Sequence, residues 1–226
     1  MIGIFDSGKG GLASFYTVRE ALPREDIVYL ADRKNAPYGT KSKEVLIELV
    51  TSDIKRLIDL GCRKILIACC TASTVYPYLD REARAASVPI IAPAARAVAG
   101  GRVAVIATER TVRSRAFSRA IKENSPETEV FEIAAGELVS LVEEGGVDGC
   151  LTPEQSRTVM RVRDKILAVR PDTLILGCTH FSHLEESFAE QLYGIKIVSA
   201  AREGAMELIS LALPEVMEGG RCCYTE

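Results

Sequence analysis

An apolar run that ends in a cysteine and a threonine occurs twice in this chain, at residues 65–71 (ILIACCT) and 174–180 (LILGCTH). Each run is typical of a buried strand that carries a thiol at its carboxyl end. In open parallel sheets, ligands bind in the crevice beyond the carboxyl ends of the strands. The repeat therefore predicts two strands that direct Cys69 and Cys178 into one site.

Strand and helix patterns alternate along the rest of the sequence. Short apolar runs predict further strands at residues 2–5, 27–31, 88–91, 103–107, 130–133 and 195–198. Alternating βα units imply parallel sheets covered by helices. We therefore expect an α/β fold with two similar domains, each a mainly parallel sheet flanked by helices and each containing one cysteine strand. The expected domains are residues 1–92 with 200–226, and residues 93–199.

Capping residues and breakers place the helices between these strands. Ser42 is a suitable N-cap for a helix that ends before Gly61, and Thr152 with Pro153 and Gln155 predicts a helix start. Further helices are expected over 71–86, with Pro77 in its first turns or at a kink, and over 111–122. Residues 93–102 resemble a crossing between the two halves.

Charge excludes one class of partner. The chain of 226 residues has 28 basic and 31 acidic residues and a net charge of −3, and these are well mixed. Nucleic acid is therefore not an expected partner. The densest basic stretch contains four arginines, which we interpret as a solvated helix face. Its members are Arg110, Arg113, Arg115 and Arg119.

Location is predicted from what the sequence lacks. It has no basic leader at its start and no apolar run of roughly 18 residues, the length that spans a bilayer. The seven cysteines are an odd number in a chain large enough to form a full core. We expect a cytoplasmic protein with free thiols and no membrane contact.

Cys69 and Cys178 both lie where a strand is expected to turn into a helix. The amino end of a helix stabilises a thiolate, so the thiol pKa is expected to fall below its usual value of about 8.5. His180 lies two residues after Cys178 and is suited to relay a proton, and Thr71 and Thr179 are suited to bind a carboxylate. The alternative is that both cysteines are structural core residues.

Two other kinds of site remain open from the residues alone. A zinc site is disfavoured because the doublets Cys69-Cys70 and Cys222-Cys223 are adjacent rather than separated by two to four residues. The glycines of residues 8–13, with Asp32 after the next strand, loosely match a dinucleotide-binding turn. Asp6 would place a negative charge near a bound pyrophosphate, which disfavours that interpretation.

Six short motifs, in this order and spacing, resemble those of the glutamate racemase family, and the resemblance spans about residues 1 to 200. They are residues 6–11 (DSGKGG), 37–39 (PYG), 68–72 (ACCTA), 107–111 (ATERT), 142–145 (VEEG) and 177–180 (GCTH). The resemblance implies a cofactor-independent enzyme that interconverts L- and D-glutamate and supplies D-glutamate for peptidoglycan. It also implies an active site between two α/β domains, and a homodimer.

The same resemblance assigns roles to individual residues. Cys69 and Cys178 would be the two proton carriers, because inversion at a carbon needs a base on one face and an acid on the other. Asp6, His180 and Glu143 would assist them. The implied substrate-binding residues are Ser7, Pro37, Tyr38, Gly39, Cys70, Thr71, Thr108 and Thr179.

Cys70 departs from the family pattern. The family has an asparagine at this position, and a thiol is a much weaker hydrogen-bonding group than an amide. This difference keeps other functions open: a racemase for aspartate or another acidic amino acid, a decarboxylase of the same superfamily, a catalytically silent homologue, or a nucleotide-binding module.

Overall fold

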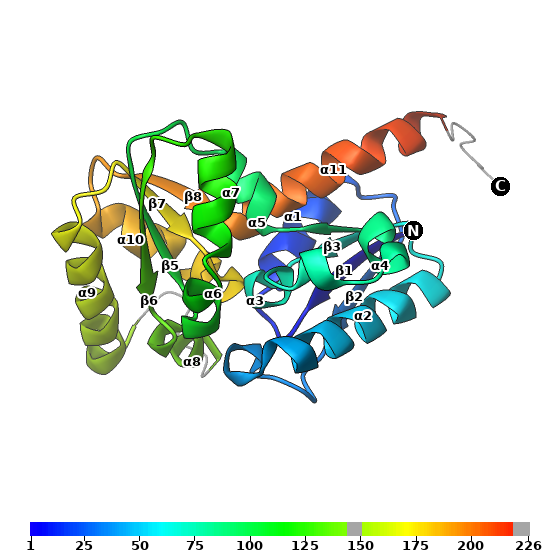
Figure 1. Ribbon diagram of the computed structural model, residues 1–226, viewed down its shortest axis with the longest axis horizontal. Coiled ribbons are helices and arrows are strands. Elements are labelled where there is room, and N and C mark those ends of the chain that lie inside the picture. Colours follow the sequence, from blue (N-terminus) through cyan, green and yellow to red (C-terminus); the bar gives the residue numbers. More distant parts are fainter. Residues whose placement is uncertain (144–150, 219–226) are drawn as a thin grey trace.

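The protein contains two four-stranded parallel sheets that lie side by side in the computed structural model, which describes residues 1–143 and 151–218 (Figure 1). The first sheet has the order β2-β1-β3-β4. Its strands are β1 (Ile2–Asp6), β2 (Ile27–Ala31), β3 (Lys64–Ile67) and β4 (Ser87–Pro89). The predicted strand that leads to Cys69 is therefore confirmed as β3.

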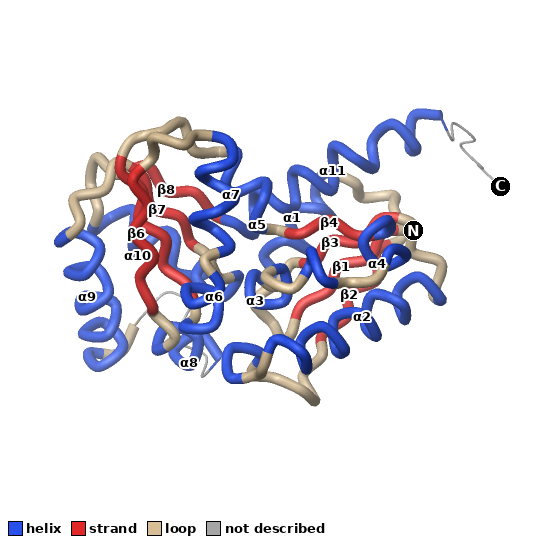
Figure 2. Tube along the Cα trace, viewed as in Figure 1, coloured by secondary structure: helices blue, strands red, loops and turns tan. Residues whose placement is uncertain are grey.

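The second sheet, whose strands are drawn in red on the left of Figure 2, repeats this order as β6-β5-β7-β8. Its strands are β5 (Arg102–Ala107), β6 (Glu129–Ala134), β7 (Thr173–Leu176) and β8 (Lys196–Ser199). All six neighbouring strand pairs within the two sheets run parallel. The predicted α/β class with two parallel sheets is confirmed.

Helices cover the outer face of the first sheet as the sequence predicts. Helix α2 (Lys43–Asp59) begins at Ser42, whose side chain accepts a hydrogen bond from the backbone N–H of Val45. The helix ends before Gly61, which has a φ of +89° and so takes the left-handed conformation that glycine adopts at low cost. Its buried face packs on the strands through apolar side chains with no exposure: Leu46, Val50, Ile54 and Leu57.

The predicted helix over 71–86 is wrong, because the segment is divided into three short pieces. They are α3 (Cys70–Ser73), the 3-10 turn η2 (Tyr76–Tyr78) and α4 (Arg81–Ala86). Pro77 lies within the 3-10 turn, and Asp80 caps the third piece by accepting a hydrogen bond from the N–H of Ala83. Residues 91–96, predicted as part of a strand and a crossing, form helix α5 (Ile91–Arg96).

The predicted helix over 111–122 is also interrupted. It consists of α6 (Glu109–Ser114) and α7 (Ala116–Asn124), and Arg115 between them has a φ of 55°. A left-handed conformation is uncommon for a residue with a side chain, so the chain direction changes at this position. The break separates Arg110 and Arg113 from Arg119.

The remaining helices complete the second half and return the chain to the first. Thr152 and Gln155 form the predicted capping box of α9 (Pro153–Ala168). The others are α1 (Leu12–Ala21), η1 (Tyr38–Thr40), α8 (Glu137–Glu143), η3 (Thr179–Leu184), α10 (Glu185–Gln191) and α11 (Ala200–Glu218). In the part of the chain that the structure describes, no helix has the length and apolar character needed to cross a membrane.

One hydrophobic cluster joins the two sheets. It contains Ile4 and Leu66 of the first sheet, Val105 and Ile175 of the second, and Leu208 of α11, all without exposure. Helix α11 runs from the end of β8 back over α1 and α5 (Figure 1). This shared core fixes the carboxyl ends of the two sheets next to each other. The domain boundaries stay a prediction.

Candidate active site

A cavity of about 480 Å³ lies where the carboxyl ends of the two sheets meet. Cys69 follows β3, Cys178 follows β7, and both line this cavity. Both thiols are nearly buried, with 6% and 7% of each residue exposed. The structure therefore brings together two cysteines that are 109 positions apart in the sequence.

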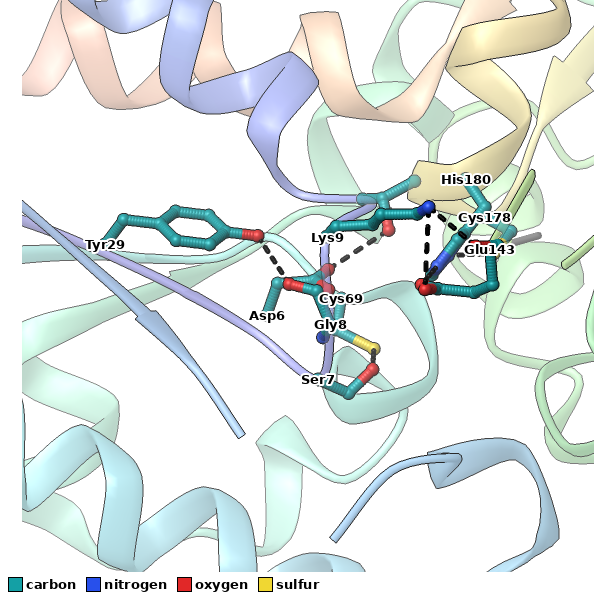
Figure 3. Close-up of polar contacts among 10 residues, drawn as sticks. Asp6, Ser7, Gly8, Lys9, Tyr29, Cys69, Glu143, Cys178 and His180 are labelled. Atoms are coloured by element: carbon teal, nitrogen blue, oxygen red, sulfur yellow. Dashed lines mark hydrogen bonds and ion pairs between the residues drawn. The ribbon is translucent and has the colours of Figure 1, made fainter. Parts of the chain in front are cut away.

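Cys69 lies against the loop that follows β1. Its Sγ is 3.4 Å from Oγ of Ser7, within hydrogen-bonding distance for sulfur (Figure 3). Burial and, to a smaller extent, the nearby Asp6 carboxylate raise the pKa of the Cys69 thiol to about 11, and the Ser7 contact opposes the rise. The prediction that a helix amino end would lower this pKa is wrong, because burial outweighs it.

Cys178 lies beside an imidazole. Its Sγ is 3.7 Å from Nδ1 of His180, and Nε2 of the same ring is 2.5 Å from Oε1 of Glu143. Burial raises the pKa of Cys178, and the charge of Cys69 raises it further. If His180 donates to Glu143 through Nε2, its Nδ1 is left as an acceptor for the thiol proton.

Asp6 lies behind the cavity rather than on its wall. The residue has no exposure, and its Oδ1 accepts a 2.7 Å hydrogen bond from the N–H of Gly8. Its Oδ2 accepts a 3.1 Å bond from the hydroxyl of Thr179. Burial raises the Asp6 pKa, whereas His180 lowers it. Asp6 thus connects the two cysteine loops without facing the cavity directly.

Three threonine hydroxyls meet at the boundary between the halves. Thr71 Oγ1 is 3.0 Å from Thr108 Oγ1 and 3.2 Å from Thr111 Oγ1, and the last two are 3.0 Å apart. Thr71 and Thr108 line the cavity, and Thr108 also caps α6 by accepting a hydrogen bond from the N–H of Thr111. The cluster presents hydroxyl donors to the cavity, which suits a carboxylate ligand.

A loop from the first half closes one side of the cavity. Pro37, Tyr38 and Gly39 line it, and the Tyr38 hydroxyl donates a 2.7 Å hydrogen bond to Oδ2 of buried Asp32. Burial and the bond to Asp32 raise the Tyr38 pKa, so the phenol stays a donor. In the sequence, Asp32 matches only the loose pattern of a nucleotide-binding turn, although its position after a strand places it near the site.

The glycines before α1 are required by close packing. A Cβ at Gly10 would lie 2.6 Å from both His180 Nδ1 and Thr179 Oγ1, and one at Gly11 would lie 2.7 Å from the Asp6 Cβ. Only glycine allows such an approach of two segments. The cysteine loop of the second half therefore occupies the space that a dinucleotide phosphate would need.

Lys9 makes a contact with Glu143 that the sequence does not predict. Its Nζ donates a 2.8 Å hydrogen bond to the backbone oxygen of Glu143 and lies 3.9 Å from Oε2 of that residue (Figure 3). Lys9 belongs to the first half and Glu143 to the second. The two residues are 134 positions apart, and no sequence pattern indicates that they are in contact.

The structure gathers the predicted residues around one cavity, with two exceptions. Ser7, Glu143, Thr179 and His180 line it together with the residues described above, whereas Asp6 and Cys70 do not. Cys70 is 2% exposed and belongs to the shared hydrophobic cluster. A contact between Cys70 and substrate stays a prediction. Residues 144 and 145 of the fifth motif, Cys222 and Cys223 lie outside the described residues.

The thiols are free in the part of the chain that the structure covers: Cys62, Cys69, Cys70 and Cys178 form no disulfide. Residues 1–143 and 151–218 contain no group of three or more His, Cys, Asp or Glu side chains arranged to hold a metal ion. The side chains that line the cavity include two thiols, an imidazole, hydroxyls and the carboxylates of Glu109 and Glu143.

Two parallel sheets of the same strand order, each followed by a cysteine after the equivalent strand, are the architecture of the α/β amino-acid racemases. Residues 17–208 match the family model described as Asp/Glu/Hydantoin racemase. The chain belongs to the Asp/Glu/hydantoin racemase family.

Individual relatives agree. A glutamate racemase of Geobacter metallireducens is 36% identical over 97% of this chain and 80% of its own length. The crystal structure of a Francisella tularensis glutamate racemase with D-glutamate has a TM-score of 0.85 at 32% identity, covering 96% of this chain and 82% of that one. An aspartate racemase of Picrophilus torridus, at 17% identity and a TM-score of 0.68, shares the fold.

Proposed function

We propose that this protein is a glutamate racemase that interconverts L- and D-glutamate without a cofactor by proton transfer between two cysteines. The observation that carries the proposal is the position of Cys69 and Cys178 on one cavity, each from a different sheet. The relatives with 36% and 32% identity, which are named glutamate racemases, support the choice of substrate.

In this mechanism one cysteine acts as a thiolate and the other as a thiol. The thiolate removes the α-proton of glutamate, the α-carbon becomes planar, and the opposite thiol donates its proton to the other face. The first sulfur ends as a thiol and the second as a thiolate, so charge and protons balance. The reverse reaction exchanges these roles.

Different neighbouring groups would stabilise the thiolate form of each cysteine. The Ser7 hydroxyl at 3.4 Å is placed to stabilise a Cys69 thiolate by donating a hydrogen bond. His180, held by Glu143, is placed to accept the Cys178 proton and leave a thiolate beside an imidazolium. Binding of the positively charged substrate ammonium would further lower the raised thiol pKa values.

The cavity would bind glutamate mainly through neutral donors. Among the described residues that line it, no lysine or arginine occurs. The hydroxyls of Thr71 and Thr108 are suited to the substrate carboxylates, whereas those of Ser7 and Thr179 are placed to donate to Cys69 and Asp6. Glu143 supplies a carboxylate for the substrate ammonium. In the cell, the product D-glutamate would serve peptidoglycan synthesis, and the family suggests a homodimer.

Proton exchange with solvent tests this function. Purified protein is incubated in D2O separately with each enantiomer of glutamate and of aspartate, and the α-proton is followed by NMR and the optical rotation by polarimetry. Both glutamate enantiomers should lose their α-proton signal as the rotation decays to zero. Absence of exchange with glutamate would refute the proposal, and exchange with aspartate alone would assign the other acidic substrate.

A further inference from the structure

A second cavity, of about 230 Å³, lies at another place on the boundary between the two halves. Its lining includes four cationic side chains and no carboxylate. The residues that matter here are Lys43, Tyr78, Arg110, Arg113, Ser114 and Arg119. The arginines are those that the sequence suggested as a solvated helix face, and the structure shows three of the four around one cavity.

The break at Arg115 makes this arrangement possible. In one continuous α-helix, Arg110 and Arg119 would be nine residues apart and would therefore point about half a turn away from each other. With the left-handed Arg115 between α6 and α7, Arg110, Arg113 and Arg119 face the same space. Backbone strain of this kind persists where the surrounding structure requires it, often at functional sites.

None of the four cations forms a salt bridge with a carboxylate among residues 1–143 and 151–218. The exposed Glu44 interacts electrostatically with Lys43 and Arg110 without forming one. Nε of Arg110 is buried and has no hydrogen-bond acceptor there. Lys43 Nζ lies 3.2 Å from the centre of the Tyr78 ring, and Arg119 donates one hydrogen bond, to the Ser114 backbone oxygen.

Four like charges around one cavity repel each other, and a buried guanidinium N–H without an acceptor is unfavourable. A multivalent anion removes both costs, and arginine binds phosphate oxygens in a bidentate way. We propose that this cavity is a binding site for a small phosphate-bearing anion, held by Lys43 from the first half and by Arg110, Arg113 and Arg119 from the second. The site needs no assumption about the reaction in the first cavity.

The position of the site also links it to the first cavity. Thr108, which lines the 480 Å³ cavity, is the N-cap of α6, and the same short helix carries Arg110 and Arg113. An anion bound between Lys43 and α6 would hold the two halves together beside the threonine cluster. Occupancy is therefore expected to change the KM for the substrate of the first cavity.

Isothermal titration calorimetry at constant ionic strength tests the proposal, with inorganic pyrophosphate and inorganic phosphate as probes. The wild-type protein should bind pyrophosphate at one site, and excess D-glutamate should not displace it. Arg110→Met and Lys43→Met should each weaken binding by about tenfold or more, the loss of one charge-assisted contact. Lys122→Met removes the same charge from α7 but lies outside the cavity, so it should stay within about twofold of wild type.

Three outcomes would overturn the site: no pyrophosphate binding at about 1 mM, equal weakening by Lys122→Met, or displacement of pyrophosphate by D-glutamate. Circular dichroism verifies that each variant is folded. If Arg110→Met does not fold, Lys43→Met and Arg110→Lys decide the question, since the latter keeps the charge and should retain part of the affinity.

Discussion

Thr179 Oγ1 donates a hydrogen bond to Oδ2 of Asp6 across 3.1 Å, although the two residues are 173 positions apart. Thr179 directly follows Cys178, and Asp6 precedes Ser7, which contacts Cys69. This buried contact therefore fixes the turn of one thiol relative to the loop of the other. The fold therefore holds the two cysteine loops in place relative to each other without a bound substrate.

Replacement of either thiol should abolish racemisation. Cys69→Ser and Cys178→Ser each remove one proton carrier, because a serine hydroxyl is far less acidic than a thiol, and one face of the α-carbon is left without its acid or base. Polarimetry on both glutamate enantiomers measures the loss. Cys62→Ser, a buried cysteine that does not line the cavity, is the matched control and should keep activity. Full activity of either thiol variant would contradict the two-cysteine mechanism.

The rate should rise with pH. Burial holds the Cys69 pKa at about 11 and raises that of Cys178, so both groups are mainly neutral thiols at pH 7. The reaction needs one thiolate, and the thiolate fraction grows about tenfold per pH unit below the pKa. We expect log kcat/KM to increase with a slope near +1 from about pH 7 to 9. A flat profile over this range would show that one thiol is already ionised.

Gly10→Ala should impair both folding and activity. The added Cβ would lie 2.6 Å from His180 Nδ1 and from Thr179 Oγ1, so the second cysteine loop must move. Overpacking of this kind costs about 1–3 kcal/mol. Thermal unfolding and kcat/KM measure the two effects. Gly39→Ala is the control for stability, since its Cβ would meet Thr108 at an ordinary 3.7 Å. An unchanged Tm for Gly10→Ala would contradict the packing argument.

Asp32→Asn should raise KM more than it lowers kcat. The carboxylate accepts hydrogen bonds from Tyr38 and from the Asn35 side chain, and an amide replaces one acceptor oxygen with a donor. The loop of Pro37 to Gly39 then loses its anchor, and we expect kcat/KM to fall about tenfold. Steady-state kinetics check this. Asp59→Asn, an exposed residue at the end of α2, should behave as wild type.

Lys9→Met should lower kcat/KM by about three- to tenfold, because it removes one partly exposed charge-assisted hydrogen bond that holds Glu143. Glu143 in turn holds His180 beside Cys178, so loss of the Lys9 hydrogen bond would disturb the position of His180 relative to the Cys178 thiol. Lys9→Arg keeps the charge and should recover most of the activity. Equal kinetics for Lys9→Met and wild type would show that Glu143 needs no support from the first half.

The sequence was sufficient for the strands and for the meeting of the two thiols, because buried parallel strands have a strong apolar signal and their carboxyl ends share one edge. It was insufficient for the helix breaks. Nothing in the local pattern marks Arg115 as left-handed, since this conformation is enforced by tertiary packing.

The thiol environment could not be predicted for a different reason. A strand-to-helix turn is visible in the sequence and predicts a lowered pKa, but burial of Cys69 and Cys178 depends on segments far away in the chain. The partners Lys9 and Asp32 were missed because each contact depends on side-chain placement in three dimensions rather than on residue spacing.

The repeated strand order has a consequence for reversibility. Cys69 and Cys178 follow equivalent strands, β3 beside β1 and β7 beside β5. Mirror-image reactant and product have equal free energies, so thermodynamics requires the same kcat/KM in both directions for the wild type and for every variant. Cys69 lies beside a hydroxyl and Cys178 beside an imidazole, so kcat and KM can each differ between the two enantiomers while their ratio stays the same. These unequal surroundings cannot favour one enantiomer at equilibrium.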